Sequence, residues 1–239
     1  MVFKTSATMN RYLNYFRNTG IFLSSLASIL IAVVLLFSAH AQNNDGFGPA
    51  DLAVTSYNNT SSLATFSDTF DRADSSPMSL TSSSGGTWET GVGGFDGMQI
   101  VGNAATGVAG ADSAMSRVVS PTFANNQSST ITFGSGNVKG ACVRMSNGGD
   151  GYLAFFSTAT IQLYKTVASS GTQLNVFDLY GSASSGWTLT LEVSGTTLTV
   201  KTNGVQVGTY SDASFSSGQP GMWSGSADGT ILEMSATDL

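Results

Sequence analysis

Histidine and cysteine are almost absent from this chain of 239 residues, which contains one of each. The single histidine, His40, lies near the amino terminus, so the rest of the chain cannot form the usual Ser-His-Asp or Cys-His nucleophilic systems or a histidine-ligated zinc site. The single cysteine, Cys142, cannot form an internal disulfide. Because no histidine or basic cluster lies beside it in sequence, we expect Cys142 to be a small buried hydrophobic side chain.

The first 41 residues differ in character from the rest of the chain. An uncharged run extends from Ile21 to Phe37, an Ala-His-Ala triplet follows at 39–41, and the run is preceded by basic residues (Lys4, Arg11, Arg17). This order predicts a secretory signal peptide at 1–41. The apolar run is also a candidate hydrophobic helix at the lower limit for crossing a bilayer, so an uncleaved signal anchor that attaches the chain to a membrane stays open. In either case we expect the remainder to be secreted or held at the cell surface.

The remainder of the chain is acidic. The three basic residues above leave with the leader, so six Lys and Arg remain against fifteen Asp and Glu, which is a net charge of −9. The basic residues are scattered, and such a chain is repelled by nucleic-acid phosphates, so we expect no nucleic-acid partner. Residues 42–63 show no sustained hydrophobic period and contain Gly46, Gly48 and Pro49, which predicts a flexible linker.

The segment 187–212, WTLTLEVSGTTLTVKTNGVQVGTYSD, spells three consecutive strands. Leu189, Leu191 and Val193 alternate with polar residues, which is the pattern of a half-buried antiparallel strand. Asn203-Gly204 is a strong signal for a two-residue hairpin, since both positions must take positive φ. Together with this segment, the patterning predicts strands and no helix after residue 63, at 65–70, 97–101, 104–108, 113–119, 129–134, 138–146, 151–156, 159–165, 173–179, 187–194, 196–202, 205–211, 220–224 and 230–236.

Three parts of the chain carry a family resemblance. The segment FSDTFDRADS at 66–75 resembles the "DTFxRAD" opening of bacterial laminin G-like domains, and SGQPGM at 217–222 is similar to their "SGQPG" turn. The Gly186-Trp187 start, with the Ser-Gly and Asn-Gly turns after it, completes the likeness to laminin G-like and concanavalin A-like jelly-roll domains of bacteria and phages. The resemblance implies an all-β, antiparallel two-sheet jelly-roll sandwich at 64–239. The apolar run at 21–37 predicts an N-terminal hydrophobic helix before it.

The densest group of acids is Asp68, Asp71 and Asp74. Carboxylate oxygens close together suggest Ca²⁺, which several jelly-roll families bind, and Asn147, Asp150 and Asp228 lie in other Gly-rich loops that could add ligands. The spacing by three is not that of a calcium loop, however, and no turning glycine is present. The alternative is that Asp68 caps the end of a strand while Asp71 and Asp74 lie in a solvated turn.

The remaining candidates for a site are aromatic. Sugar rings stack their C–H faces on exposed aromatic rings, and Trp223, Tyr152 and Tyr180 lie beside Gly-rich turns, so these three are the candidate ligand-binding residues. For each of them packing in the core is the competing interpretation. Trp88 and Trp187 are expected to pack internally.

Three functions fit these observations. The first is an exported, non-catalytic surface module that binds an extracellular glycan, as a lectin-like or adhesion domain does. The second is a structural or interaction protein of an envelope or particle surface. The third is a polysaccharide-cleaving enzyme, which needs two acids about 5 to 10 Å apart in a cleft. The glutamates Glu89, Glu192 and Glu233 are widely separated and do not form the E-x-D-x-x-E arrangement of β-glucanases on this fold, so we favour the non-catalytic module.

Overall fold

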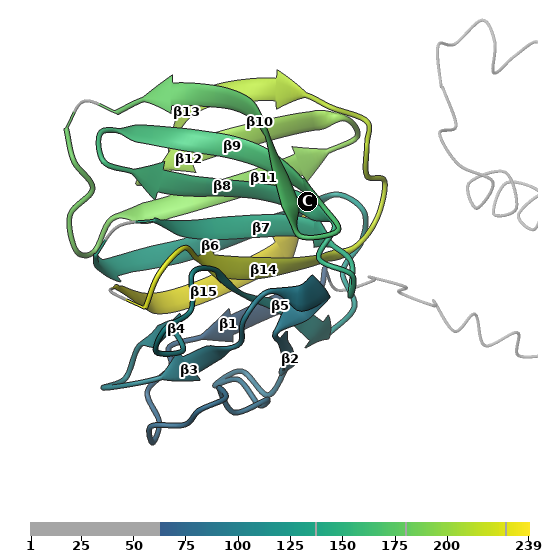
Figure 1. The fold of residues 1–239 in the computed structure, drawn as a ribbon. Helices are drawn as coiled ribbons and strands as arrows, with labels where there is room; N and C mark the ends of the chain where they lie inside the picture. Colours follow the sequence, from purple (N-terminus) through teal and green to yellow (C-terminus); the bar gives the residue numbers. More distant parts are fainter. Residues whose placement is uncertain (1–62, 137, 180, 228) are drawn as a thin grey trace, which may run out of the picture. The chain divides into compact units, whose positions relative to one another are not determined.

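The computed structural model describes residues 63–136, 138–179, 181–227 and 229–239. The predicted signal peptide, hydrophobic helix and all of the predicted linker except Leu63 lie outside the described residues. Over the described ranges the chain is all-β, as expected, and builds two antiparallel sheets (Figure 1). No helix in these ranges is long and apolar enough to cross a membrane.

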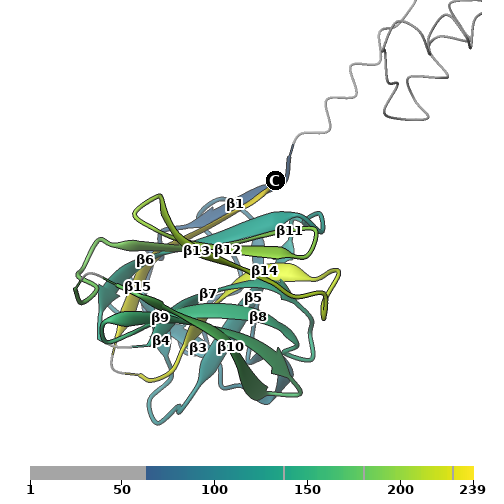
Figure 2. The same cartoon turned by 90° about the horizontal axis from the view of Figure 1, so that it is seen from above.

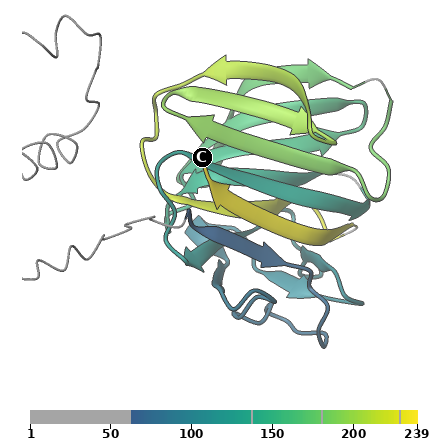
Figure 3. The same cartoon turned by 180° about the vertical axis from the view of Figure 1, so that it is seen from behind.

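The two sheets pack face to face as the layers of a sandwich, which Figure 2 shows from above. The seven-stranded sheet has the order β10 (Ser170–Asp178), β9 (Thr160–Val167), β8 (Gly151–Ser157), β7 (Lys139–Met145), β14 (Gln219–Ser224), β5 (Ala114–Ser120), β2 (Thr87–Thr90). The eight-stranded sheet, seen from behind in Figure 3, has the order β13 (Val205–Ser211), β12 (Thr197–Thr202), β11 (Thr188–Ser194), β6 (Gln127–Ser135), β15 (Thr230–Asp238), β4 (Ala105–Gly107), β3 (Met98–Ile100), with β1 (Thr65–Asp68) also paired to β15.

The pattern of the 187–212 segment is confirmed. Leu189, Leu191 and Val193 are fully buried in the core between the sheets. Thr202 pairs with Val205, and the two residues between them, Asn203 and Gly204, have φ values of 49° and 77°. Both central residues therefore take the positive φ that this hairpin turn requires.

Each of the expected strands is present, and the structure adds one. Strand β2 was not predicted because its four residues, TWET, are too few to show a period. A short 3-10 turn, η1 (Val92–Gly94), follows it where no helix was expected, and Gly91 and Gly93 supply positive φ there. The burial of Cys142 is confirmed, since its side chain is fully inaccessible and burial raises the pKa of the thiol.

Candidate functional site

The central part of the seven-stranded sheet is apolar on both of its faces. On β8 the side chains of Tyr152, Ala154 and Phe156 enter the core between the sheets, whereas Leu153 and Phe155 lie on the outer face. This follows from the sequence GYLAFF, in which every position after the glycine is apolar, so both phases of the strand alternation carry hydrophobic side chains. The outer face therefore holds a second apolar cluster, separate from the main core.

Three rings of this second cluster form a continuous row across the outer face. The ring centroid of Phe155 lies 4.9 Å from that of Trp223 on β14 and 5.5 Å from that of Tyr164 on β9. Trp223 and Tyr164 are half-buried, while Phe155 between them is 9% exposed. We call Trp223, Phe155 and Tyr164 the aromatic row. These two distances place the ring centroids of Trp223 and Tyr164 no more than about 10 Å apart.

A glycine allows the row to close. Strand β7 lies between β14 and β8, and its Gly140 pairs in register with both Trp223 and Phe155. A Cβ atom at Gly140 would lie 2.6 Å from Leu153 Cδ1 and 2.9 Å from Phe155 Cβ. Because no side chain stands on β7 at this point, the rings from the strands on either side can meet over it.

Polar groups border the aromatic row. The Arg117 guanidinium on β5 forms an ion pair with Glu89 on β2, with Nε 2.6 Å from Oε2. Gln162 pairs in register with Phe155, and Gln173 Oε1 accepts a hydrogen bond of 3.5 Å from the Tyr164 hydroxyl. These groups can exchange hydrogen bonds with ligand hydroxyls beside an apolar surface, which is the mixture that small-molecule sites use.

Loops close one end of the outer face. Val92 of η1 is buried in the second apolar cluster. Gly93 lies so close to the Gly-rich loop at 147–150 that a Cβ atom on it would be 2.3 Å from Gly148 O. Within that loop Asp150 Oδ1 accepts a hydrogen bond of 2.8 Å from Ala168 N, so its carboxylate joins the loop to the β9–β10 turn.

The three aromatic residues that the sequence predicts as ligand-binding residues have different outcomes in the structure. Trp223 lies at one end of the aromatic row, and its indole Nε1 donates to Ser113 Oγ at 2.6 Å. Tyr180 lies outside the described residues. Tyr152 is fully buried on the opposite face of β8, so no face of its ring is open to a ligand.

The surroundings of Tyr152 explain its burial. Its hydroxyl donates to Asp212 Oδ1 at 2.8 Å and accepts from Phe215 N at 3.1 Å, so the polar end of the ring is satisfied inside the protein. Burial raises the pKa of Tyr152 to about 12. Burial also raises the pKa of Asp212, but hydrogen bonds from Ser214 and Tyr152 and the charge of Lys165 outweigh it and lower that pKa to about 2.

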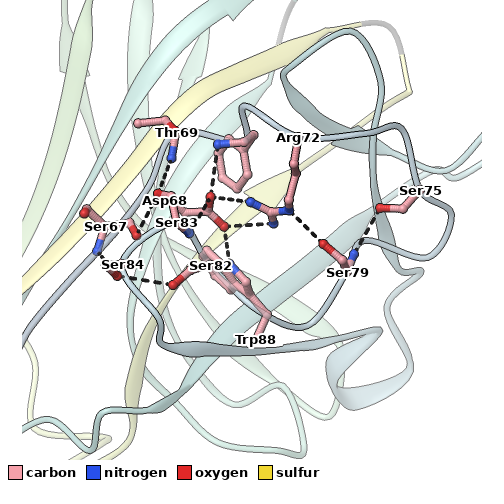
Figure 4. Close-up of polar contacts among 11 residues, drawn as sticks. Ser67, Asp68, Thr69, Arg72, Ser75, Ser79, Ser82, Ser83, Ser84 and Trp88 are labelled. Atoms are coloured by element: carbon pink, nitrogen blue, oxygen red, sulfur yellow. Dashed lines mark hydrogen bonds and ion pairs between the residues drawn. The ribbon is translucent and has the colours of Figure 1, made fainter.

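The three predicted metal ligands do not form a metal-binding group. Figure 4 shows the surroundings of Asp68. Asp68 is fully buried at the end of β1, where its carboxylate forms a bidentate ion pair with Arg72 at 2.5 and 2.9 Å and accepts from Trp88 Nε1 at 2.7 Å. Asp74 is exposed and accepts from Gly102 N at 2.8 Å, and Asp71 is exposed. Within 63–239, leaving aside the three positions not described, no three acidic, histidine or cysteine side chains come close enough to hold a metal ion.

Sequence reasoning found one end of the aromatic row and missed the rest. Phe155 and Tyr164 were not selected because neither adjoins a glycine-rich turn. A signal was present in β8, whose apolar residues occupy both strand faces, since a sheet with only one covered face alternates apolar and polar residues. That continuous run indicates that the outer face of β8 is also covered or bound.

No known protein family matches the chain, and no curated protein matches it. Solved structures do match. The exoplasmic/lumenal domain of VIP36 in its Ca²⁺/Man2-bound form is 13% identical, with a TM-score of 0.50, over 74% of this chain and 89% of that chain. The carbohydrate recognition domain of Emp47p is 12% identical, with a TM-score of 0.50, over 75% and 98%. The carbohydrate binding module CBM66 from Bacillus subtilis is 19% identical, with a TM-score of 0.48, over 61% and 91%. At these identities the first two likenesses show that the chain has the lectin-type sandwich fold.

Proposed function

We propose that this chain is a non-catalytic carbohydrate-binding module that holds an extended glycan on the aromatic row. The observation that carries the proposal is the row itself, in which Phe155 contacts both Trp223 and Tyr164 on the outer face of one sheet. Aromatic faces bind the apolar C–H faces of sugar rings, and the neighbouring Arg117, Glu89, Gln162 and Gln173 offer partners for sugar hydroxyls. Because three neighbouring rings can contact more than one sugar unit, the row suits an oligosaccharide better than a single sugar.

The fold supports this assignment by analogy. The VIP36 domain was crystallised with Ca²⁺ and mannose-type ligands, and the Emp47p domain is a carbohydrate recognition domain. Because one fold hosts many functions, this likeness only raises the expectation that the present sandwich binds a glycan. The charge of Asp68 is offset by the Arg72 guanidinium, so the proposal does not use this carboxylate as a metal ligand.

We also propose that the module is exported. The leader predicted at 1–41, the linker at 42–63 and the resemblance to laminin G-like domains of bacteria and phages support a module displayed outside the cell, either free or attached to a membrane through Ile21 to Phe37. Its partner is then an extracellular glycan or surface polymer. An alternative is a structural protein of an envelope or particle surface, and the threonine-rich outer face of the eight-stranded sheet fits it.

The positions of the glutamates favour binding over cleavage. Glu89 lies in the seven-stranded sheet, whereas Glu192 and Glu233 lie in the eight-stranded one. Glu192 and Glu233 pair in register with Ser128 and Thr132 of β6, which places them about 13 Å apart along the strands. That separation exceeds the roughly 5 to 9.5 Å between the catalytic acids of glycoside hydrolases.

The decisive test is a glycan array probed with the full chain, in mild detergent if the leader is retained. We expect binding to extended oligosaccharides that increases with chain length up to the span of the row. A panel of soluble polysaccharides incubated with the same protein measures sugar release. Absence of binding to every glycan, with and without added Ca²⁺, would favour the structural protein, and released sugar would favour the enzyme.

A further inference from the structure

A concave site separate from the aromatic row lies at one end of the sandwich, where loops from both sheets meet. It has a volume of about 400 Å³, which falls within the range of small-molecule sites. Its lining includes two residues before β6, one from β7, one from the β11–β12 turn and two from the β13–β14 connection: Asn125, Asn126, Arg144, Thr196, Phe215 and Ser216. We call it the Arg144 groove, and none of its residues belongs to the aromatic row.

The charge of Arg144 is buried without a carboxylate partner. Its side chain is 3% exposed, and it donates from Nε to Asn125 O at 2.9 Å and from Nη1 to Phe215 O at 2.7 Å. Arg144 forms no ion pair with any described carboxylate, whereas four other Lys and Arg side chains do. A buried charge is normally paired with an opposite charge. We therefore expect the Arg144 guanidinium to bind an anion.

One nitrogen of Arg144 remains open to the groove. Nη2 forms no hydrogen bond with any described residue. No fully buried side-chain nitrogen or oxygen in the described ranges lacks a partner, so Nη2 is not fully buried. Because Arg144 lines the groove, we infer that Nη2 faces it. A guanidinium presents N–H groups in a fixed plane that matches a carboxylate.

The backbone holds Arg144 firmly in this position. Its φ of 53° lies in the left-handed region, which a non-glycine residue seldom adopts and which occurs often at functional sites. Gln127 Oε1 accepts from Arg144 N at 3.2 Å, and a Cβ atom on Gly218 would lie 2.3 Å from the Arg144 carbonyl carbon. The side chain is therefore preorganised by contacts on both sides.

The rest of the groove offers neutral hydrogen-bonding groups and one ring. Asn126 Oδ1 accepts from Gly195 N at 2.9 Å, which leaves its amide NH₂ free to donate to a ligand. The side chains of Asn125 and Ser216 are exposed and form no hydrogen bond with described residues. Phe215 is half-buried and adds an apolar surface. Amides, a hydroxyl and a ring face suit the hydroxyls and C–H groups of a sugar.

We propose that the Arg144 groove binds an acidic sugar, with the sugar carboxylate on Nη2 of Arg144 and its hydroxyls on the asparagine and serine side chains. A purely structural role, in which Arg144 holds two loops together, explains its two hydrogen bonds to backbone carbonyl groups. It does not account for a guanidinium charge without an acid or for the open Nη2. The site is independent of the aromatic row and does not rest on the function proposed for that row.

The test is calorimetric titration of the full chain with D-glucuronate, with D-glucose as the neutral counterpart and acetate as the free carboxylate. Glucuronate should bind at least about tenfold more tightly than either, because a hydrogen bond to a charged group is stronger than one to a neutral group. Equal affinity for glucose or for acetate overturns the proposal, as does the absence of saturable binding up to about 10 mM glucuronate.

Variants locate the binding without disturbing the core. Replacing Arg144 could unfold the protein because it joins two loops, so Ser216→Glu, at an exposed residue of the groove, is used to place a repelling charge beside the carboxylate. Ser216→Glu should weaken glucuronate binding at least about tenfold, whereas Ser217→Glu, at the exposed next residue outside the groove lining, should not. Equal losses in both variants overturn the proposal. Trp223→Ala should leave glucuronate affinity unchanged, which separates this site from the aromatic row.

Discussion

The outer faces of the two sheets are built from different kinds of side chain. On β11 and β12 of the eight-stranded sheet the residues between the buried ones are threonine and charged side chains, and Thr130 Oγ1 on the neighbouring β6 lies 2.8 Å from Thr190 Oγ1. Lys201 and Glu192 form an ion pair of 2.6 Å on the same face. On the seven-stranded sheet the corresponding positions carry the aromatic row and the apolar cluster beneath it.

The difference indicates which face binds a ligand. A threonine-rich face exchanges hydrogen bonds with water and needs no cover, as on many antiparallel sheets. Apolar side chains on an outer face are removed from water only when another part of the protein or a ligand covers them, and this removal is favourable. The loop that contains Val92 covers part of it, and the half-buried Trp223 and Tyr164 remain for a ligand.

The largest expected effect is on stability. Phe155→Ala removes the central ring of the row and should lower the free energy of unfolding by about 3 kcal/mol, because the ring packs against Trp223, Tyr164 and the cluster below. Thr199→Ala, on the outer face of the other sheet, should change it by no more than about 0.5 kcal/mol. Urea unfolding measures both. Similar small losses in the two variants would mean that the outer face of the seven-stranded sheet is not a packed layer.

Trp223→Ala tests the same comparison by binding. Loss of the half-buried indole should weaken oligosaccharide affinity about 30-fold, a cost of about 2 kcal/mol, which is typical of a dominant aromatic contact. Thr190→Ala on the eight-stranded sheet is the matched control and should leave affinity unchanged. Titration calorimetry with the best array ligand provides the measurement. If Thr190→Ala lost the larger share of affinity, the binding face would be the threonine-rich one.

Features of these faces could be predicted where they depend on residues that are close together in the sequence, and not where they depend on pairing between distant strands. The alternation of Leu189, Leu191 and Val193 and the Asn203-Gly204 turn are short-range patterns, so the strands and the sandwich could be derived from them. The aromatic row depends instead on the register of Trp223 with Gly140 and of Gly140 with Phe155, which long-range packing sets. No local pattern contains that register.

Residues singled out by their local surroundings show the same limit. Tyr152 was selected because it follows a glycine-rich loop, but the phase of β8 directs it inward and directs Phe155 outward. Asp68 was grouped with Asp71 and Asp74 by spacing. Its partner Arg72 is local, at i+4, whereas Trp88, which donates to the same carboxylate, is twenty residues away.

A smaller effect distinguishes the ion pairs on the two faces. Arg117→Ala and Lys201→Ala each remove one partly exposed ion pair, so each should lower the free energy of unfolding by no more than about 1 kcal/mol. Arg117 borders the aromatic row, so its loss should also weaken oligosaccharide binding about tenfold, whereas the loss of Lys201 should not. Titration calorimetry on both variants checks this, and equal affinities would show that Arg117 does not contact the ligand.

The smallest effect concerns Cys142, which lies on the same outer face as the aromatic row but fully buried beneath neighbouring side chains. Burial raises the pKa of its thiol above the ordinary 9.0, so the folded protein keeps the proton that the unfolded chain loses. The stabilisation is therefore complete below pH 9.0 and is lost as the pH rises above it. Between about pH 7 and pH 9.5 the wild type should lose up to about 1 kcal/mol more than Cys142→Ala in urea unfolding. A thiol reagent should not modify native Cys142, yet it should modify Thr199→Cys in the Cys142→Ala background, where the thiol lies on the solvated face. Rapid modification of native Cys142 would show that the apolar outer face opens to water and is not the covered layer that distinguishes it from the threonine-rich face.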